Sequence, residues 1–247
     1  MAEAIGVKNE NKLEGKVIII TGGANGIGEA TARLFANHNP SMIVIADIQD
    51  EKGHEVATSI GSQICSYIHC DVTYELQVKS MVDSTVKSYG RLAIMFSNAG
   101  IVNFNQQEIL DLDLSAYDRL MAINTRGMLA CVKTIVCTAS IAASLPLGGF
   151  LDYGMSKHAV LGLMRSASVQ LGKYALGTPM TCEAYGTDIE GVEKRFPSSC
   201  ALGGDGLALK ANHVANAVLF LASEDSAFIT GHDLVVDGGY IQSSLIN

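Results

Sequence analysis

Short runs of apolar, β-branched residues alternate along this chain with longer segments whose apolar residues recur at helical spacing. The runs typical of buried strands are "KVIIIT" (16–21), "MIVIAD" (42–47), "QICSYIHCDV" (63–72) and "LAIMFSNAG" (92–100). The helical segments between them are "IGEATARLFANH" (27–38), "EKGHEVATSI" (51–60) and "YELQVKSMVDSTVKSYG" (74–90). Apolar strands separated by helices indicate a parallel sheet with helices on both faces. We expect one doubly wound α/β domain over residues 1–247, because no linker or internal repeat divides the chain.

Composition and charge narrow the class further. The 247 residues are 48% apolar and 17% charged, which allows a large core and argues against disorder. The net charge of −8 repels a phosphate backbone, so nucleic acid is a poor partner. The first sixteen residues carry three glutamates and no long apolar stretch, and no run approaches the ~18 apolar residues of a membrane span. We expect a cytoplasmic protein without a membrane partner.

The cysteines indicate neither a metal centre nor a disulfide framework. They are spread along the chain, without a C-x-x-C pair, as Cys65, Cys70, Cys131, Cys137, Cys182 and Cys200. In a chain this long and apolar, we expect buried free thiols. The run His69-Cys70-Asp71 contains three kinds of metal ligand, but neighbours on a strand point to opposite faces and cannot meet one ion. We expect no structural metal.

A glycine-rich turn, "TGGANGIG" (21–28), joins the first strand to the first helix. Gly22 and Gly26 allow a tight turn that comes close to a pyrophosphate, and Gly28 allows the helix to pack against the strand. The helix N-terminus around Asn25 and Ile27 offers free N–H groups and a positive dipole end to an anion. Between a strand and a helix, this pattern favours a dinucleotide site.

The second strand ends in an acidic residue, Asp47, about twenty residues after the glycine loop. A carboxylate there can bind the adenosine ribose hydroxyls and repels a 2′-phosphate, which favours NAD over NADP. No Lys or Arg follows at once, which supports NAD. Asp47 can equally cap the next helix, and one residue can serve in both ways.

The motifs "TGGANGIG", "CDV", "NAG", Asn124, Ser140 and "YGMSK" (153–157) follow one another in this order. Together they resemble the short-chain dehydrogenase/reductase family, nearly from end to end, and "DLVVDGG" is similar to that family's last strand. The chain looks most like plant members that act on monoterpenoid alcohols, the isopiperitenol dehydrogenase and nepetalactol-related members, in "IGSQICSYIHCDVT", "MSKHAVLGLMRSAS" and "FITGHDLVVDGG". The resemblance implies a Rossmann-type fold, NAD as cofactor and a homodimer or homotetramer.

The resemblance also assigns the catalytic roles. Tyr153 is implied to be the general acid/base, with its pKa lowered from ~10 by Lys157 and by the charge of the oxidised nicotinamide. Lys157 is also implied to hold the nicotinamide ribose, Ser140 to bind the reacting oxygen, and Asn124 to fix a water that links Lys157 to solvent. Each residue has a structural alternative: Ser140 as a helix N-cap, Asn124 as a buried amide that joins two strand ends, and Tyr153 with Lys157 as a helix surface pair one turn apart.

Further cofactor contacts follow from the same resemblance. Asp71 is implied to face the adenine amino group, Ile48 to flank the adenine, and Thr178 to meet the nicotinamide carboxamide. Along the adenosine side the implied residues are Val72, Asn98, Ala99 and Gly100.

The chain is shorter than the family pattern in two places. The predicted helix Leu114–Lys133 runs into the strand "IVCTAS" (135–140) without a return loop, and "GKYALGTPM" (172–180) leaves no room for the strand expected before Thr178. A lost interior strand would leave neighbouring strands unpaired. Either residues of the natural protein are missing from this sequence, or a shortened variant has lost normal cofactor binding. We favour the first, because every flanking motif is complete.

The residues near the predicted catalytic pair are apolar and include no cationic clamp. They are Ile141, Ala142, Leu145, Leu147, Phe150 and Leu151, and residues 181–206 are implied to form a substrate lid. A small apolar alcohol is the natural substrate class. The main prediction is NAD-dependent oxidation of a cyclic monoterpenoid alcohol or lactol. The alternatives are a non-redox terpenoid cyclase or isomerase with NAD as a structural part, and a binding module without catalysis.

Overall fold

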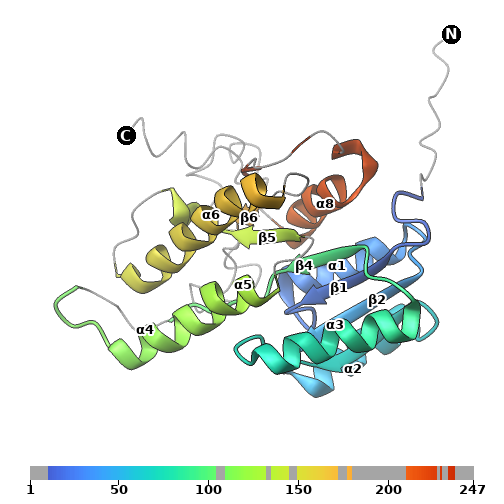
Figure 1. Cartoon of the computed structure of the whole chain (residues 1–247), viewed down its shortest axis with the longest axis horizontal. Helices are drawn as coiled ribbons and strands as arrows, with labels where there is room; N and C mark the ends of the chain where they lie inside the picture. Colours follow the sequence, from blue (N-terminus) through green and yellow to red (C-terminus); the bar gives the residue numbers. More distant parts are fainter. Residues whose placement is uncertain are drawn as a thin grey trace, which may run out of the picture.

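The computed structural model describes residues 11–103, 109–131, 135–144, 149–171, 177–179, 210–226, 229 and 233–236. Within these residues, the chain forms a parallel sheet of six strands in the order β3-β2-β1-β4-β5-β6 (Figure 1). The strands are β1 Val17–Thr21, β2 Met42–Asp47, β3 Cys65–His69, β4 Ile94–Ser97, β5 Ile135–Ala139 and β6 Gly177–Pro179. The predicted doubly wound sheet is therefore confirmed.

Helices connect the strands and cover both faces of the sheet. They are α1 Gly26–Ala36, α2 Asp50–Ile60, α3 Glu75–Tyr89, α4 Leu114–Met121, α5 Met128–Ala130, α6 Leu151–Leu171 and α8 Ala211–Ala222. A π-helical segment, η1 Ala122–Gly127, joins α4 to α5, and short 3₁₀ turns lie at η2 Ile141–Ala143 and η5 Glu224–Ser226. The elements through α3 overlap the segments that the sequence predicts, with shorter strands.

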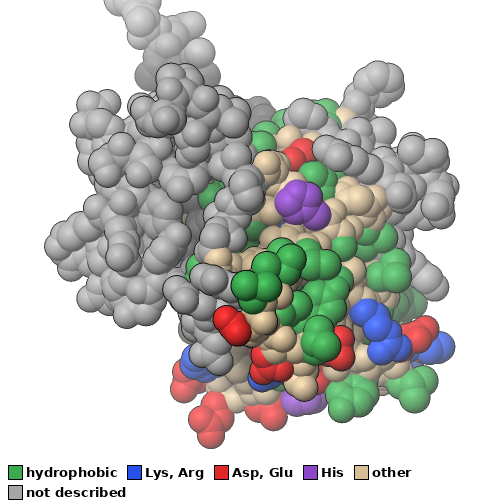
Figure 2. All heavy atoms as spheres, turned by 90° about the vertical axis from the view of Figure 1, so that its left-hand side faces the viewer, with side chains coloured by type: hydrophobic (Ala, Val, Ile, Leu, Met, Phe, Trp, Pro, Cys, Tyr) green, Lys and Arg blue, Asp and Glu red, His purple; other side chains and the backbone are tan. Residues whose placement is uncertain are grey.

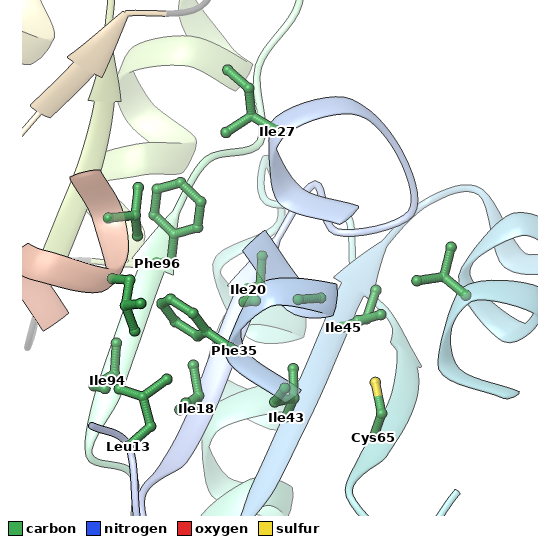
Figure 3. Close-up of a cluster of buried hydrophobic side chains, with 14 of the residues drawn as sticks. Leu13, Ile18, Ile20, Ile27, Phe35, Ile43, Ile45, Cys65, Ile94 and Phe96 are labelled. Carbon is green, nitrogen blue, oxygen red and sulfur yellow. The ribbon is translucent and has the colours of Figure 1, made fainter. Parts of the chain in front are cut away.

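Alternate side chains of β1 enter two separate cores, as the period of two along a strand requires. Ile18 and Ile20 pack with residues of α1, α2 and α8, while Val17 and Ile19 pack on the opposite face with residues of α3. Figure 3 shows the first cluster, in which Phe35 of α1 lies against the strand side chains. Because both cores are apolar, the sheet is a rigid platform whose carboxyl-terminal edge carries the loops after β1, β2 and β4.

At the first place where the chain is shorter than the family pattern, the helix before β5 ends earlier than predicted. We expected helix over Leu114–Lys133, but α5 ends at Ala130, and β5 begins at Ile135 and pairs with β4. The helix therefore ends before Lys133, and the residues between Cys131 and Ile135 lie outside the described part of the chain.

No strand was expected in this stretch, and the structure forms one that includes Thr178 and does not precede it. Gly177–Pro179 forms β6, and its three residues pair in parallel with Cys137, Thr138 and Ala139 of β5. A strand of three residues is below the mean of ~5–6, but it gives β5 a neighbour on its second side. The motif "DLVVDGG" is described only for 233–236, where Asp233 forms an isolated bridge and Val236 packs against the first core.

Four of the cysteines are free and buried, as predicted: Cys65, Cys70, Cys131 and Cys137. Burial raises the pKa of each thiol, to about 12 for Cys70 and about 11 for Cys131. Cys182 and Cys200 lie outside the described residues. Over the described parts of the chain, no three His, Cys, Asp or Glu side chains are grouped as a metal site would need. The helices described there include none long and apolar enough to cross a membrane.

Candidate active site

Tyr153 and Lys157 lie one turn apart on α6, and both side chains are buried. The ammonium nitrogen of Lys157 lies over the Tyr153 ring, 5.7 Å from its centroid. Burial excludes the alternative in which the two residues form a helix surface pair. An ammonium this close to a phenol can stabilise the negative charge of the phenolate when Tyr153 loses its proton.

Ser140 follows β5 and reaches Tyr153 from the neighbouring segment. Burial raises the pKa of the Tyr153 hydroxyl to about 12, and a hydrogen bond with the Ser140 side chain opposes this rise. The Ser140 hydroxyl also accepts a hydrogen bond of 3.1 Å from the Ala142 backbone N–H, so it caps the turn η2. Burial thus outweighs the Ser140 hydrogen bond in the pKa of Tyr153. The lowering expected from Lys157 together with the charge of an oxidised nicotinamide stays a prediction.

Lys157 is fully buried and donates a 3.1 Å hydrogen bond to the Thr138 carbonyl of β5. Burial lowers the pKa of its ammonium group to about 8. The Thr138 hydroxyl in turn donates to the Asn98 side chain at 3.1 Å, and the Asn98 amide donates to the Thr21 carbonyl at 3.1 Å. One polar chain thus connects Lys157 to the end of β1, where the glycine loop begins.

Asn124 lies in the π-helical segment η1 and is fully buried. Its side chain makes two 2.8 Å hydrogen bonds with the backbone of Ile101, accepting from the N–H and donating to the carbonyl. It also donates to the Ser156 hydroxyl at 3.2 Å, and that hydroxyl donates to the Tyr153 carbonyl at 2.8 Å. Asn124 therefore joins the segment after β4 to helix α6, and not two strand ends as its structural alternative states. Its role in holding a water stays a prediction. π-Helical turns occur frequently at functional sites.

The glycine loop packs tightly on one side and is open on the other. A Cβ added at Gly28 would lie 2.1 Å from the Gly22 carbonyl oxygen, so only glycine lets α1 start this close to the loop. Gly26 has a φ of 56° and a Cβ there would meet nothing within 4 Å. The Asn25 side chain accepts from the Gly26 N–H at 2.7 Å, and Ile27 is buried in the first core. The open space at a helix N-terminus fits the pyrophosphate of a dinucleotide.

Asp47 ends β2 and its carboxylate is buried and hydrogen bonded. One oxygen accepts from the backbone N–H groups of Ile48 and Gln49 at 2.8 and 3.1 Å, and the other accepts from Ala24 N–H of the glycine loop at 3.0 Å. The residue therefore fixes the turn before α2 and the glycine loop together. Only one described donor reaches the second oxygen, so that oxygen can still accept from a ribose hydroxyl.

The remaining predicted cofactor residues lie at the ends of β2, β3 and β4. Ile48 is exposed beside Asp47, and Val72 is buried against Gly127. The Asp71 carboxylate accepts from the Thr73 N–H and hydroxyl at 2.9 and 2.8 Å, which shapes the turn after β3. Asn98, Ala99 and Gly100 follow β4, with Asn98 buried in the polar chain described above.

Thr178 does not lie in a loop beyond the sheet. It is the middle residue of β6, in register with Thr138. Its contact with a nicotinamide stays a prediction, as do the roles of the other cofactor residues. The proposed lid, residues 181–206, lies outside the described residues.

Hydrocarbon side chains pack around Tyr153. Leu120, Ala142 and Tyr153 form one buried cluster, and three partly buried side chains pack against it: Ile101, Val102 and Phe150. They come from four segments that meet only in the fold. The described contacts of Tyr153 thus combine one hydroxyl partner with an apolar wall.

Three polar residues of the site were missed by the sequence reasoning: Thr138, Ser156 and Asp152. Ser156 could have been found, since it lies inside "YGMSK" one turn after Tyr153. Thr138 alternates with Cys137 on a buried strand, which places it on one face without naming a partner. Asp152 reads as a surface acid in the first turn of a helix, and only the fold shows that it is completely buried.

Comparison with known proteins places this geometry in a family. The profile described as "Enoyl-(Acyl carrier protein) reductase" matches residues 22–241, which run from the glycine loop past the Tyr153–Lys157 pair. The chain belongs to the short-chain dehydrogenase/reductase family, whose members are oxidoreductases that generally use NAD or NADP. The resemblance drawn from the motifs is confirmed.

Among its relatives are plant enzymes of monoterpenoid metabolism. The chain is 50% identical to (+)-cis,trans-nepetalactol synthase NEPS2 of Nepeta racemosa, with 94% of this chain and 96% of that protein covered. It is 49% identical to the mitochondrial (−)-isopiperitenol/(−)-carveol dehydrogenase of Mentha piperita, with 92% and 94% covered. It is 41% identical to secoisolariciresinol dehydrogenase of Forsythia intermedia, with 93% and 90% covered. The first alignment spans 264 positions against a chain of 247 residues, so that relative carries residues without a counterpart here.

Proposed function

We propose that this protein is an NAD-dependent dehydrogenase that oxidises a cyclic monoterpenoid alcohol or lactol. The observation that carries the proposal is the buried Tyr153 hydroxyl, hydrogen bonded to Ser140, beside the buried ammonium of Lys157 and an apolar wall. A phenol in this position can take a proton from an alcohol held against the wall. The relation to a carveol dehydrogenase adds support for the substrate class.

The residues divide the work of alcohol oxidation. Ser140 holds the substrate oxygen at Tyr153, and Tyr153 removes the hydroxyl proton while the carbon loses a hydride. A bound NAD would supply a hydride acceptor and a positive charge at this site. Lys157 supplies a second cation that favours the phenolate form of Tyr153, against the desolvation that raises its pKa. Leu120, Val102 and Phe150 exclude water from the reacting carbon.

The preference for NAD rests on Asp47. Its carboxylate lies at the end of β2 beside the open N-terminus of α1, where a 2′-phosphate would meet a negative charge. The open space at Gly26 would hold the pyrophosphate, and Ile48 would flank the adenine.

The first test is NADH absorbance when the purified protein is mixed with NAD and a panel of (−)-isopiperitenol, (−)-carveol and nepetalactol. A rise with NAD and not with NADP supports the proposal. Tyr153→Phe should abolish turnover and leave NAD binding within about twofold, because it removes only the hydroxyl. Full activity in that variant would overturn the assigned role of Tyr153.

A second candidate is a non-redox cyclase or isomerase that uses NAD as a structural part. It is favoured by the 50% identity to a nepetalactol synthase. Product formed from a reactive enol or dialdehyde, without any change in NADH absorbance, would select this candidate. A protein that binds NAD but turns over no substrate in either assay would be a binding module.

A homo-oligomer is part of the proposal. Leu114 of α4, Leu129 of α5 and Met155 of α6 are exposed apolar side chains. The face turned to the viewer in Figure 2, the left-hand side of Figure 1, carries a gathering of hydrophobic side chains. A dimer or tetramer that covers such a patch is expected in solution. We also propose a cytoplasmic location, although the Mentha relative is named as mitochondrial.

A further inference from the structure

Asp152, the residue before Tyr153, is a completely buried carboxylate that the mechanism above does not use. One oxygen accepts a 2.7 Å hydrogen bond from the Tyr153 backbone N–H, which is one of the free amides in the first turn of α6. The other oxygen accepts a 2.6 Å hydrogen bond from the Asn103 side-chain amide. Both described hydrogen-bond partners are neutral, so within the described residues the Asp152 carboxylate forms no ion pair. A buried carboxylate is retained against its desolvation penalty only where its contacts are strong.

Asn103 connects this carboxylate to a second helix. Its amide also donates to the Ala116 carbonyl of α4 at 3.2 Å. One side chain of the segment after β4 is therefore held by the start of α6 and by α4 at once. The charge on Asp152 strengthens the first of these contacts, since hydrogen bonds to an ionised group are stronger than neutral ones.

The short segment Ile101–Asn103 is anchored at both ends to α6. At its first residue, Asn124 binds the Ile101 backbone and also donates to Ser156, three residues after Tyr153. At its last residue, Asn103 binds Asp152, one residue before Tyr153. Tyr153 thus lies between the two anchor points.

Between the two anchors, the segment turns apolar side chains toward Tyr153. Ile101 and Val102 pack against the buried cluster that contains Tyr153 and Leu120. The segment is therefore a wall of the site, and the Asn103–Asp152 hydrogen bond sets how far this wall stands from the phenol. A shift of this wall changes where a hydrocarbon ring can lie relative to the Tyr153 hydroxyl.

We propose that Asp152 is a positioning residue for substrate binding: through Asn103 it holds the Ile101–Asn103 wall against Tyr153. The effect of Asp152 on substrate binding rests on the proposed function. Its hydrogen bond to Asn103 is observed independently of that function. Cofactor residues such as Asp47 and Asn98 lie on other segments and make no described contact with Asp152. The inference therefore predicts a loss in substrate binding without a loss in NAD binding.

The test begins with Asp152→Asn in the full-length protein. An asparagine keeps an oxygen for the Tyr153 N–H but presents an amide where Asn103 needs an acceptor, so the wall contact is broken selectively. With (−)-carveol as the probe, we expect KM to rise about tenfold, with kcat falling less and the NAD dissociation constant within about twofold. Equal loss of carveol and NAD binding, or an unchanged KM, would overturn the proposal.

Two further variants make the comparison specific. Asp113→Asn is the matched control, because Asp113 caps the exposed start of α4 through the Ser115 and Ala116 N–H groups and Asn caps equally well. It should leave KM unchanged. Asn103→Ala removes the Asp152 contact and also the Ala116 contact, so its effect should be at least as large as that of Asp152→Asn. The double variant should be no worse than Asn103→Ala alone, because that variant already lacks the contact with Asp152. Additive losses would contradict the proposal.

Amide hydrogen exchange decides the structural part without any substrate. In Asp152→Asn, amides of 101–103 should exchange at least about fivefold faster, while those of β1 and β2 keep their rates. Unchanged exchange over 101–103 would overturn the wall contact. If wild-type protein turns over no alcohol, the proposed function fails, and the exchange result still decides whether Asp152 holds the wall.

Discussion

The Lys157 ammonium lies over the ring of Tyr153, 5.7 Å from its centroid, with both side chains enclosed in the fold. Burial moves the two pKa values in opposite directions: it raises that of Tyr153 to about 12 and lowers that of Lys157 to about 8. Each shift favours the neutral form, as desolvation requires. Burial of the charged Lys157 ammonium therefore destabilises the folded protein, and this cost can be measured as a dependence of the unfolding free energy on pH.

Lys157→Met should make the protein more stable near neutral pH. The folded-state pKa of Lys157 is about 8 against 10.5 when unfolded, so between these values the unfolded chain binds more protons and wild-type stability gains with pH. Below pH 8 the penalty is complete, at about 3 kcal/mol. The advantage of the variant should therefore be largest at pH 7 and shrink toward pH 9.5, as measured by urea unfolding.

The unfolding free energies of variant and wild type are subtracted at each pH. Buried thiols such as Cys70 ionise above pH 9 only in the unfolded chain, which lowers the stability of both proteins equally. Lys87→Met is the control, since Lys87 is exposed on α3. Its difference from wild type should not change with pH. A stability advantage of Lys157→Met that is constant from pH 7 to 9.5 would mean that the pKa of Lys157 is not lowered.

Ser140→Ala should slow alcohol oxidation and move its pH dependence upward. The Ser140 hydrogen bond lowers the pKa of Tyr153, so its loss raises that pKa further and reduces the reactive phenolate at a given pH. We expect kcat/KM to fall about 10²-fold at pH 8 and at pH 10 alike, because both lie below a pKa of about 12 and the phenolate fraction falls by the same factor at each. Ser144→Ala, at the exposed end of the same turn, should retain the wild-type profile. Wild-type kcat/KM in Ser140→Ala would contradict the role of this hydrogen bond.

Gly28→Ala should disrupt the glycine loop, because the added Cβ would lie 2.1 Å from the Gly22 carbonyl oxygen and backbone must move. We expect NAD binding to weaken at least about tenfold and stability to fall by about 1–3 kcal/mol. Gly162→Ala is the matched substitution within α6, where a Cβ meets nothing within 4 Å. It should stabilise the helix by about 0.5–1 kcal/mol, measured by thermal unfolding. Normal NAD binding in Gly28→Ala would mean that NAD binding does not require the close contact between Gly28 and the Gly22 carbonyl.

The sequence predicted most of the sheet because its strands are locally unambiguous. β1 and β2 are continuous β-branched runs that must be buried on both faces, and the order of the elements leaves few topologies. The Tyr153–Lys157 spacing likewise places both side chains on one face of a helix before any fold is known.

The features that were missed depend on partners distant in the chain. Gly177–Pro179 has neither the length nor the composition of a strand, and it becomes β6 only because β5 offers a free edge. Asp152 carries no local sign that Asn103, 49 residues away, will enclose it. The pKa of Tyr153 follows from burial, which a motif does not report.

Asp47→Asn should weaken the preference for NAD over NADP. A negative charge about 4 Å from a 2′-phosphate charge opposes its binding by about 4 kcal/mol at an effective dielectric of 20, and the amide removes that term. We expect the ratio of the two dissociation constants to fall at least about tenfold, measured by titration with NADH and NADPH fluorescence. Asp83→Asn, on the exposed face of α3, changes the net charge equally and should leave the ratio unchanged. An unaltered ratio in Asp47→Asn would mean that Asp47 serves only to tie Ala24, Ile48 and Gln49 together, as its hydrogen bonds already do.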